Sequence, residues 1–266
     1  QNWQAALEAG NSHPPMGLRV NRRRVATEAY LVRLADAGMP ARALGVSALL
    51  LAQPVSVELL PGFSNGEVSV QDAGAQRAAE YLDLAAGQRV LDACAAPGGK
   101  TGHILELADV ELTALDADPK RCQQIRQNLQ RLGLDARIAA ADCAQPGAWW
   151  DGKPFDRILA DVPCSGSGIA RRRPDIKWLR RAGDPARFAL EQAHILDALW
   201  QVLAPGGKLL YVTCSVFPEE NAATVGAFCA RQPSAHRLAL AGCAPAQLLP
   251  GPEHDGFFFA LLGKRS

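Results

Sequence analysis

Residues 88–101 read QRVLDACAAPGGKT, and this stretch decides the fold that the sequence predicts. It begins with the apolar pair Val90 and Leu91, which indicates a buried strand, and then breaks into small residues. From Thr101 it continues as a helical pattern. A strand that passes through a glycine turn into a helix lets the backbone approach a ligand and offers free N–H groups. The stretch therefore predicts a binding loop for a nucleotide-like cofactor.

Two other phosphate-binding loops do not fit this stretch. The dinucleotide fingerprint G-x-G-x-x-G is absent, and a P-loop ending in Gly99, Lys100 and Thr101 would need glycine where the chain has Cys94. We therefore expect a nucleoside cofactor without a triphosphate. An ordinary strand–turn–helix unit without a ligand is the alternative.

The composition is that of a globular protein. With 266 residues the chain can form one sizeable α/β domain and a small accessory one. No apolar run approaches the roughly 20 residues of a membrane span, and the first ten residues lack the pattern of a signal peptide. We expect no membrane association. The chain does not begin with Met, which indicates a fragment or a processed chain.

The cysteines and histidines narrow the classes further. Seven cysteines without a C-x-x-C pair indicate free thiols in a reducing compartment, the cytoplasm. The five histidines do not cluster with them at ligand spacing, so we expect no metal. A net charge of +1 does not by itself indicate a nucleic-acid partner.

The hydrophobic pattern divides the chain near residue 70. Residues 1–70 predict a small α+β unit with a partly irregular lead-in that ends in a short strand at 18–20, a helical pattern over 22–38, and strands at 43–51 and 67–70. Residues 71–266 alternate between helices and strands. Helices are expected at 73–84, 99–108, 119–132, 185–203 and 218–229, and strands at 89–92, 111–115, 136–140, 156–160, 208–213, 236–240 and 256–262. This alternation predicts an α/β domain with a mostly parallel, doubly wound sheet that binds ligands at the strand carboxyl ends.

Two acidic residues follow strands beyond the glycine turn. Asp116 ends a strand about twenty residues after it, where a carboxylate accepts hydrogen bonds from ribose hydroxyls. Asp142 ends the next strand and could reach the exocyclic amine of an adenine. Helix capping and turn chemistry are the alternative interpretations.

Two thiols and a carboxylate follow neighbouring strands. DVPCSGSG contains Asp161 and Cys164, and YVTCS contains Cys214, so the predicted sheet delivers all three to one crevice. An isolated cysteine is usually a small buried hydrophobe. That interpretation suits Cys122, Cys143, Cys229 and Cys243.

Two basic clusters are candidates for contact with a nucleic-acid backbone. The run after Cys164 interleaves Trp178 with Arg171, Arg172, Arg173, Lys177, Arg180 and Arg181. The other cluster is Arg22, Arg23 and Arg24. A solvated loop and a solvated helix start are the respective alternatives.

Four of these stretches together resemble a known family. VLDACAAPGGKT, ALDADPKR, DRILADVPCSGSG with RRRPDIKW, and YVTCSVFPEEN are similar, in order, to motifs of the RNA cytosine-5 methyltransferases. The likeness is closest to the bacterial RsmB (Sun/Fmu) group, which modifies small-subunit ribosomal RNA. HPPMGLRVN and DGFFFALL match the same group. The resemblance implies a Rossmann-like class I methyltransferase domain over 71–266, preceded by an RNA-recognition-like domain over 1–70. The group's further N-terminal helical domain, similar to the antitermination factor NusB, is expected to be missing here.

The resemblance also implies a reaction. A methyl group passes from S-adenosylmethionine to carbon 5 of a cytosine in 16S ribosomal RNA, after Cys214 adds to carbon 6. Cys164 assists removal of the carbon 5 proton and release, and Asp161 holds or protonates nitrogen 3. The resemblance surrounds S-adenosylmethionine with Cys94, Ala95, Ala96, Pro97, Gly98, Gly99, Lys100, Asp116, Asp142 and Asp161. We expect RNA contacts from Arg22, Arg23, Arg24, Arg171, Arg172, Arg173 and Lys177, and a monomeric protein.

Other functions remain open at this point. The same chemistry on transfer RNA or another ribosomal site would use the same motifs. DNA cytosine methylation would take the cysteine of the PCS motif as nucleophile, which would make Cys214 dispensable. A non-catalytic RNA-binding module would bind S-adenosylmethionine without turnover. A thiol redox enzyme is disfavoured because Cys164 and Cys214 do not form a C-x-x-C motif.

Overall fold

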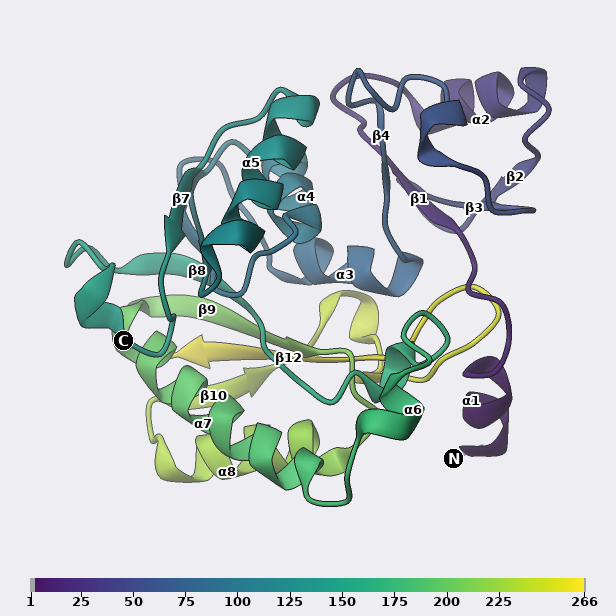
Figure 1. Ribbon diagram of the computed structural model, residues 1–266. Coiled ribbons are helices and arrows are strands. Elements are labelled where there is room, and N and C mark those ends of the chain that lie inside the picture. Colours follow the sequence, from purple (N-terminus) through teal and green to yellow (C-terminus); the bar gives the residue numbers. More distant parts are fainter. Residues whose placement is uncertain (1–2, 266) are drawn as a thin grey trace.

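Two sheets organise residues 3–265, the part of the chain that the computed structural model describes (Figure 1). The smaller sheet is antiparallel and has the strand order β2-β3-β1-β4. The larger sheet has the order β10-β12-β9-β8-β5-β6-β7, with β11 paired to β12. Among the described residues, no helix is both long and apolar enough to cross a bilayer.

The smaller sheet lies in the first seventy residues, where the sequence predicts an α+β unit. Its strands are β1 (Gly17–Val20), β2 (Ala41–Ala43), β3 (Ala48–Leu51) and β4 (Val68–Val70). Helix α2 (Thr27–Asp36) buries Tyr30 and Leu34 against Leu18, Leu49 and Val68 of this sheet. Helix α1 (Trp3–Ala9) precedes the sheet and buries no side chain.

Two predictions for this unit are wrong. The helix expected over 22–38 begins at Thr27, because Asn21 turns the chain: its carbonyl accepts from the backbone N–H of Arg24 and of Val25. The strand expected over 43–51 is a hairpin in which Ala43 pairs with Leu49. The lead-in, expected to be partly irregular and to end in a short strand, contains α1 and an irregular stretch before β1.

The larger sheet is mostly parallel, as predicted. Its parallel strands are β5 (Arg89–Asp92), β6 (Glu111–Asp116), β7 (Arg137–Ala140), β8 (Phe155–Asp161) and β9 (Leu203–Thr213). Strand β12 (Phe257–Lys264) runs antiparallel to β9, and both β10 (Ala235–Leu238) and β11 (Gln247–Leu248) run antiparallel to β12. The expected strand at 89–92 and the expected helix at 119–132 agree with the structure residue for residue.

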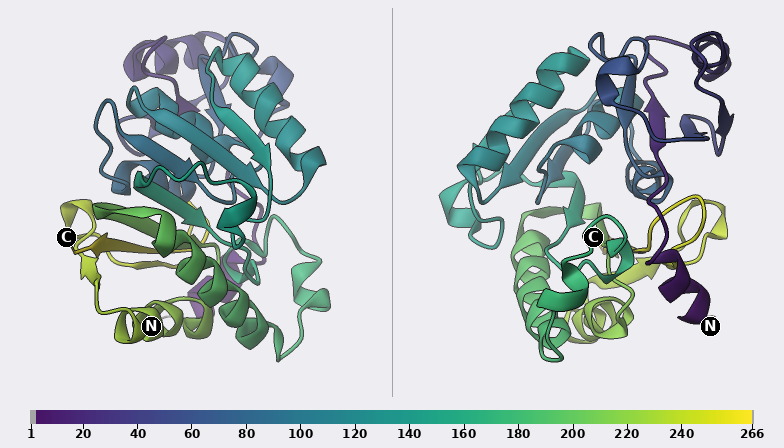
Figure 2. Two further views of the ribbon diagram at one scale, coloured as in Figure 1. Left: turned by 90° about the vertical axis from the view of Figure 1, so that its left-hand side faces the viewer. Right: turned by 45° about the vertical axis from the view of Figure 1, so that its right-hand side comes forward.

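Helices cover both faces of the larger sheet, which makes it doubly wound (Figure 1 and Figure 2). One face carries α3 (Ala73–Tyr81), α4 (Gly99–Leu107) and α5 (Pro119–Leu132). The other carries α7 (Asp184–Val202) and α8 (Ala222–Arg231). Successive side chains of β9 alternate between these two cores, since Leu210 and Val212 pack with the first set and Leu209 and Tyr211 with the second.

Short helical segments fill the connections. The sequence did not predict α6 (Ile176–Leu179) or the 3-10 turns η1 (Val57–Leu59), η2 (Pro146–Ala148), η3 (Ser167–Ile169) and η5 (Ala241–Cys243). The helix expected over 218–229 divides into η4 (Pro218–Glu220) and α8. The domain boundary near residue 70 stays a prediction; β4 ends at Val70 and α3 begins at Ala73.

A buried ion pair joins the two sheets. Arg19 of β1 donates from Nε and Nη2 to the two carboxylate oxygens of Glu106 in α4, at 2.9 and 2.7 Å. Both side chains are buried. A bidentate pair of this kind fixes orientation as well as distance, so the small sheet has a defined position against α4.

Candidate active site

The carboxyl ends of the parallel strands bring the predicted residues to one edge of the larger sheet. Strand β5 ends at Asp92 and β8 ends at Asp161, and Cys214 directly follows β9. Residues 94–100, which we call the glycine loop, connect β5 to α4. Gly98 in this loop has φ 96°, and a Cβ there would lie 3.1 Å from the Cα of Ile125, so only glycine fits.

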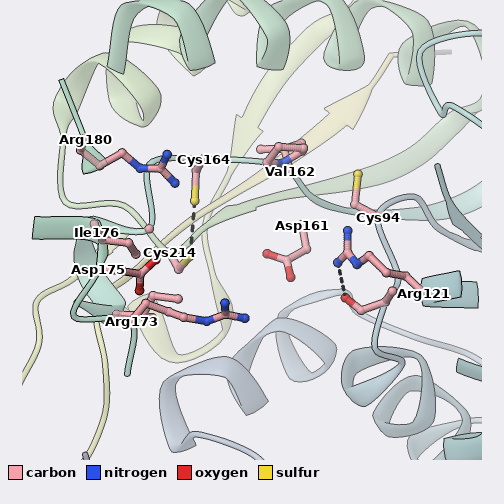
Figure 3. Close-up of a pocket in the computed structure, with 14 residues that line it drawn as sticks. Cys94, Arg121, Asp161, Val162, Cys164, Arg173, Asp175, Ile176, Arg180 and Cys214 are labelled. Carbon is pink, nitrogen blue, oxygen red and sulfur yellow. Dashed lines mark hydrogen bonds between the residues drawn. The ribbon is translucent and has the colours of Figure 1, made fainter. Parts of the chain in front are cut away.

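The two predicted thiols are in contact. Cys164 Sγ and Cys214 Sγ lie 3.3 Å apart, because β8 and β9 are neighbours and each cysteine follows the end of its strand. They line a cavity of about 340 Å³, which we call the sulfur cavity. Figure 3 shows Asp161 between this pair and Cys94. The prediction of one shared crevice for Asp161, Cys164 and Cys214 agrees with this geometry.

A second cavity shares Asp161 with the first. It measures about 190 Å³ and is lined by the glycine loop, Asp92 and Gln71; we call it the loop cavity. Cys94, Ala96 and Asp161 line both cavities. A group bound in the loop cavity therefore meets a group bound in the sulfur cavity at Asp161.

Lys100 and Asp161 form an ion pair between the two cavities. Lys100 Nζ lies 2.5 Å from Asp161 Oδ2, and both side chains are largely buried. Burial acts to lower the pKa of Lys100, but the Asp161 carboxylate outweighs it and raises that pKa, so Lys100 is positively charged.

Cys214 is protonated in this environment. The hydrogen bond with Cys164, burial and the Asp161 carboxylate together raise the pKa of Cys214 well above its usual value. The Lys100 ammonium acts in the opposite direction. Because the thiolate is the nucleophilic form, a reaction at Cys214 requires loss of this proton.

Asp92 leaves an acceptor free in the loop cavity. Its Oδ2 accepts a 2.7 Å hydrogen bond from Thr101 Oγ1, whereas its buried Oδ1 has no partner within the described residues. Burial raises the pKa of Asp92 to about 7. A buried acceptor without a partner fits a ligand that brings an N–H or O–H donor.

Asp116 and Asp142 organise the backbone around this edge. Asp116 is buried and accepts from the backbone N–H of Ala96 at 3.2 Å and of Asp118 at 3.1 Å, which holds the glycine loop against β6. Asp142 is exposed and accepts from the backbone N–H of Ala144, as in a turn. Neither carboxylate is among the residues that line the two cavities.

The basic residues after Cys164 differ in what their side chains contact: some line the sulfur cavity, and others bond to other parts of the chain. Arg173 and Arg180 line the sulfur cavity (Figure 3). For Arg171 the predicted RNA contact is wrong, because its side chain is 2% exposed and Nε donates to Asp255 Oδ1 at 2.6 Å. Arg172 is exposed and forms ion pairs with Asp255 and Asp72, and its RNA contact stays a prediction. Lys177 Nζ donates to the carbonyl of Gly10 at 2.9 Å.

Two arginines of the first basic cluster connect the two sheets. Arg23 Nε donates to the carbonyl of Glu106 at 2.8 Å, and Arg24 Nη2 donates to the carbonyl of Leu132 at 2.7 Å. Both arginines are exposed, and their contact with RNA stays a prediction. The side chain of Arg22 is exposed and makes no hydrogen bond or ion pair within the described residues.

Sequence reasoning missed three residues beside the site. Arg19 Nη1 donates to the carbonyl of Gly99 at 2.8 Å and also to Gln71. Glu220 is fully buried and accepts from the backbone N–H of Ser165 at 2.7 Å. The doublet of glutamates in PEEN follows the TCS motif closely, which was the one available signal for Glu220. No group of three His, Cys, Asp or Glu side chains in residues 3–265 is arranged to hold a metal ion.

The fold and this edge define the class of protein, a Rossmann-like methyltransferase preceded by a ferredoxin-like domain. The family described as 16S rRNA methyltransferase RsmB/F matches residues 79–263. The ferredoxin-like domain of RsmF/B-like methyltransferases matches residues 1–58. The chain therefore belongs to the RsmB/F family of 16S rRNA methyltransferases.

Individual relatives agree with this assignment. The chain is similar to "Ribosomal RNA small subunit methyltransferase B" of Pseudomonas putida, with 49% identity over 99% of this chain and 63% of the relative. The protein of that name from Vibrio cholerae is 50% identical over 100% of this chain and 62% of the relative. The chain thus spans less than two thirds of their length. A solved methyltransferase homologue from Pyrococcus horikoshii superposes with a TM-score of 0.85 and 29% identity, over 98% of this chain and 90% of that one.

Proposed function

We propose that the chain methylates carbon 5 of a cytosine in 16S ribosomal RNA, with S-adenosylmethionine as methyl donor and Cys214 as covalent nucleophile. The observation that carries the proposal is the contact of 3.3 Å between the sulfurs of Cys164 and Cys214, in one cavity with Asp161. Methyl transfer to an RNA nitrogen or oxygen has no need for two thiols, whereas carbon 5 of cytosine has to be activated by addition at carbon 6.

The loop cavity fits S-adenosylmethionine better than a nucleoside triphosphate. A triphosphate would bring negative charge against Asp92 and Asp161. Lys100, the one cation among the described residues that line the cavity, is already paired. The free Oδ1 of Asp92 suits a donor such as an amino group. When bound, S-adenosylmethionine supplies the methyl group and a positively charged sulfonium.

The residues of the sulfur cavity divide the work on the cytosine. Cys214 loses its proton, and its sulfur bonds to carbon 6 while Asp161 hydrogen-bonds or protonates nitrogen 3. Carbon 5 then bonds to the methyl carbon while the bond from that carbon to the sulfonium sulfur breaks, and the neutral thioether S-adenosylhomocysteine leaves. Cys164 assists removal of the carbon 5 proton, the electron pair of that C–H bond re-forms the double bond between carbons 5 and 6, and the bond to Cys214 breaks.

The substrate cytosine has to be outside a base stack, since neither face of carbon 6 is accessible within a helix. The sulfur cavity opens beside Arg173 and Arg180, whose guanidinium groups suit the phosphates on either side of an extruded nucleotide. We therefore propose a single-stranded or unstacked segment of the RNA as substrate.

A trapping experiment tests the proposal. Cys164→Ala and Cys214→Ala are each incubated with unmodified 16S ribosomal RNA and labelled S-adenosylmethionine and run on a denaturing gel. We expect a covalent protein–RNA adduct with Cys164→Ala and none with Cys214→Ala. The thiol of Cys229, on α8 and outside both cavities, provides the control, and Cys229→Ala should turn over like the unmodified chain.

Two results would contradict the proposal. An adduct confined to Cys214→Ala would make Cys164 the nucleophile. Methylated RNA without 5-methylcytidine in its nucleoside digest would place the chemistry on another atom.

A further inference from the structure

Glu220 connects the two loops that carry the site's sulfurs. Its Oε2 accepts from the backbone N–H of Ser165, and its Oε1 accepts from Ser215 Oγ, each at 2.7 Å. Ser165 follows Cys164 and Ser215 follows Cys214. Each oxygen of one buried carboxylate therefore holds the neighbour of one sulfur.

Further hydrogen bonds fix this carboxylate in place. Gln192 Nε2 donates to Glu220 Oε2 at 3.4 Å and to the carbonyl of Pro163 at 2.9 Å. The hydroxyl of Tyr211 donates to the carbonyl of Glu220 at 2.6 Å. The hydroxyl oxygens of Ser165 and Ser215 lie 3.2 Å apart. The two loops thus share one network, with Glu220 as the member bonded to both.

Glu220 has no counter-charge among the described residues: no lysine, arginine or histidine of residues 3–265 forms an ion pair with it, and it is 0% exposed. Arg180 contacts the network at the carbonyl of Ser165, to which its Nε donates at 2.7 Å. A buried carboxylate without a counter-charge is costly, and hydrogen bonds from correctly placed donors have to offset that cost. Displacing either loop breaks one of these bonds, so the carboxylate penalises any change in the spacing of the loops.

We propose that Glu220 is a positioning residue that sets the separation of the Cys164 and Cys214 sulfurs. It acts through Ser165 and Ser215 and lines neither cavity. The inference rests on the proposed function, because it concerns the spacing between the sulfur that attacks the cytosine and the sulfur that assists its release. The separation of the two sulfurs can also be tested without RNA.

The hydrogen bonds of Glu220 to Ser165 and Ser215 determine which substitutions test its role. Glu220→Met keeps the length of the side chain and removes both acceptors, which leaves the N–H of Ser165 buried without its partner. Glu220→Gln keeps one acceptor for that N–H, and its amide can donate to the hydroxyl of Ser215. Glu219 is exposed and adjacent, so Glu219→Met is the matched control. Of the two bonds to Glu220, Ser215→Ala removes only the second, together with the contacts of Ser215 Oγ to the hydroxyls of Ser165 and Ser167 and to the N–H of Phe217, and it serves if Glu220→Met does not fold.

The rate of disulfide formation with the oxidant diamide depends on the distance between the two sulfurs, and so it tests the spacing. Each disulfide removes two protons and two electrons from a thiol pair, and diamide is reduced to the hydrazine. The pair Cys94 and Cys143, 3.8 Å apart and without contact to Glu220, is an internal reference. Peptide mapping by mass spectrometry gives the ratio of the two rates. We expect Glu220→Met to lower the rate for Cys164–Cys214 about tenfold relative to the reference. Glu220→Gln and Glu219→Met should leave the ratio near its original value.

Kinetics provide the second measurement. Glu220→Met should lower kcat for 16S ribosomal RNA on the order of 100-fold, with rescue by Glu220→Gln, while KM for S-adenosylmethionine changes by less than about twofold. An unchanged disulfide ratio in Glu220→Met, or in Ser215→Ala where that variant is used, overturns the inference. Absence of 5-methylcytidine with the unmodified chain overturns the proposed function instead, and the disulfide ratio then still decides the role of Glu220.

Discussion

Arg19 Nη1 donates a 2.8 Å hydrogen bond to the carbonyl oxygen of Gly99, across the boundary between the ferredoxin-like sheet and the glycine loop. The same nitrogen donates to Gln71 Oε1, and Nε and Nη2 donate to the carboxylate of Glu106. Gln71 itself lines the loop cavity. The N-terminal sheet is therefore part of the structure that shapes the loop cavity.

Arg19→Lys should weaken binding of S-adenosylmethionine about tenfold, the value of roughly one hydrogen bond. A lysine keeps the charge beside Glu106 but cannot present the planar fork that also reaches Gly99. Isothermal titration calorimetry measures the effect. Arg24→Lys is the control, because Arg24 also joins the two sheets but bonds Leu132, away from the glycine loop. Equal losses in the two variants would assign the effect to docking in general.

Lys100→Met should slow alkylation of Cys214. The ammonium of Lys100 is the group that lowers the pKa of Cys214 against burial and the Cys164 contact, so its loss leaves less thiolate at a given pH. In the unmodified chain, the rate with iodoacetamide should rise about tenfold per pH unit between about pH 7 and 9, since the thiol is mostly protonated there. Mass spectrometry reports the rate, with exposed Cys243 as a reference for reagent access. A plateau below pH 8 would contradict the raised pKa.

Asp92→Asn should stabilise the chain at pH 8. The folded-state pKa of Asp92, about 7, lies above its ordinary value of 3.8, so between these values the folded chain binds more protons than the unfolded chain. The contribution of Asp92 to the free energy of unfolding therefore falls as the pH rises from 3.8 to about 7, and it is constant at higher pH. Asparagine keeps the acceptor for Thr101 without the buried charge.

The gain from Asp92→Asn has an upper limit of about 4 kcal/mol at pH 8 and should be smaller at pH 5. Urea unfolding at the two pH values measures it. A difference between the variant and the unmodified chain that is independent of pH would show that Asp92 does not titrate in this window.

Arg173→Ala should weaken RNA binding and make the slope of log K against log salt less negative by about 1. Arg173 lines the sulfur cavity, and its guanidinium makes no hydrogen bond or ion pair within the described residues. Filter binding over a range of salt concentrations gives the slope. Arg126→Ala removes an exposed charge from α5, where it lines neither cavity, and should leave the slope closer to that of the unmodified chain. Identical slopes for Arg173→Ala and the unmodified chain would remove Arg173 from the interface.

Local patterns predicted the elements whose boundaries depend on local chemistry. Helix α5 begins with Pro119 after Asp118, whose carboxylate caps the N–H of Lys120, and it ends before Gly133 with φ 66°. The helix expected from residue 22 was different, because apolar spacing over 22–38 is continuous while Asn21 turns the chain for several residues. When the apolar residues of a turn continue the spacing of the helix that follows, the periodicity alone does not reveal the turn.

The same limit applies to the site. Parallel strands that end at one edge were enough to bring Asp161, Cys164 and Cys214 together. The partner of Asp161, however, is Lys100, 61 residues away. Arg171 belongs to a run that is uniformly basic in sequence, and its burial follows from a partner 84 residues away. Pairings at such separations are decided by packing, which no local pattern encodes.

The antiparallel strand β12 determines when the strand that leads to Cys214 is complete. Strand β9 pairs with β8 on one side and with β12 on the other. During translation the chain emerges in order, and β9 remains an edge strand until residues 257–264 have left the ribosome. A nascent chain therefore exposes one unpaired edge of this strand after Cys214 itself has emerged.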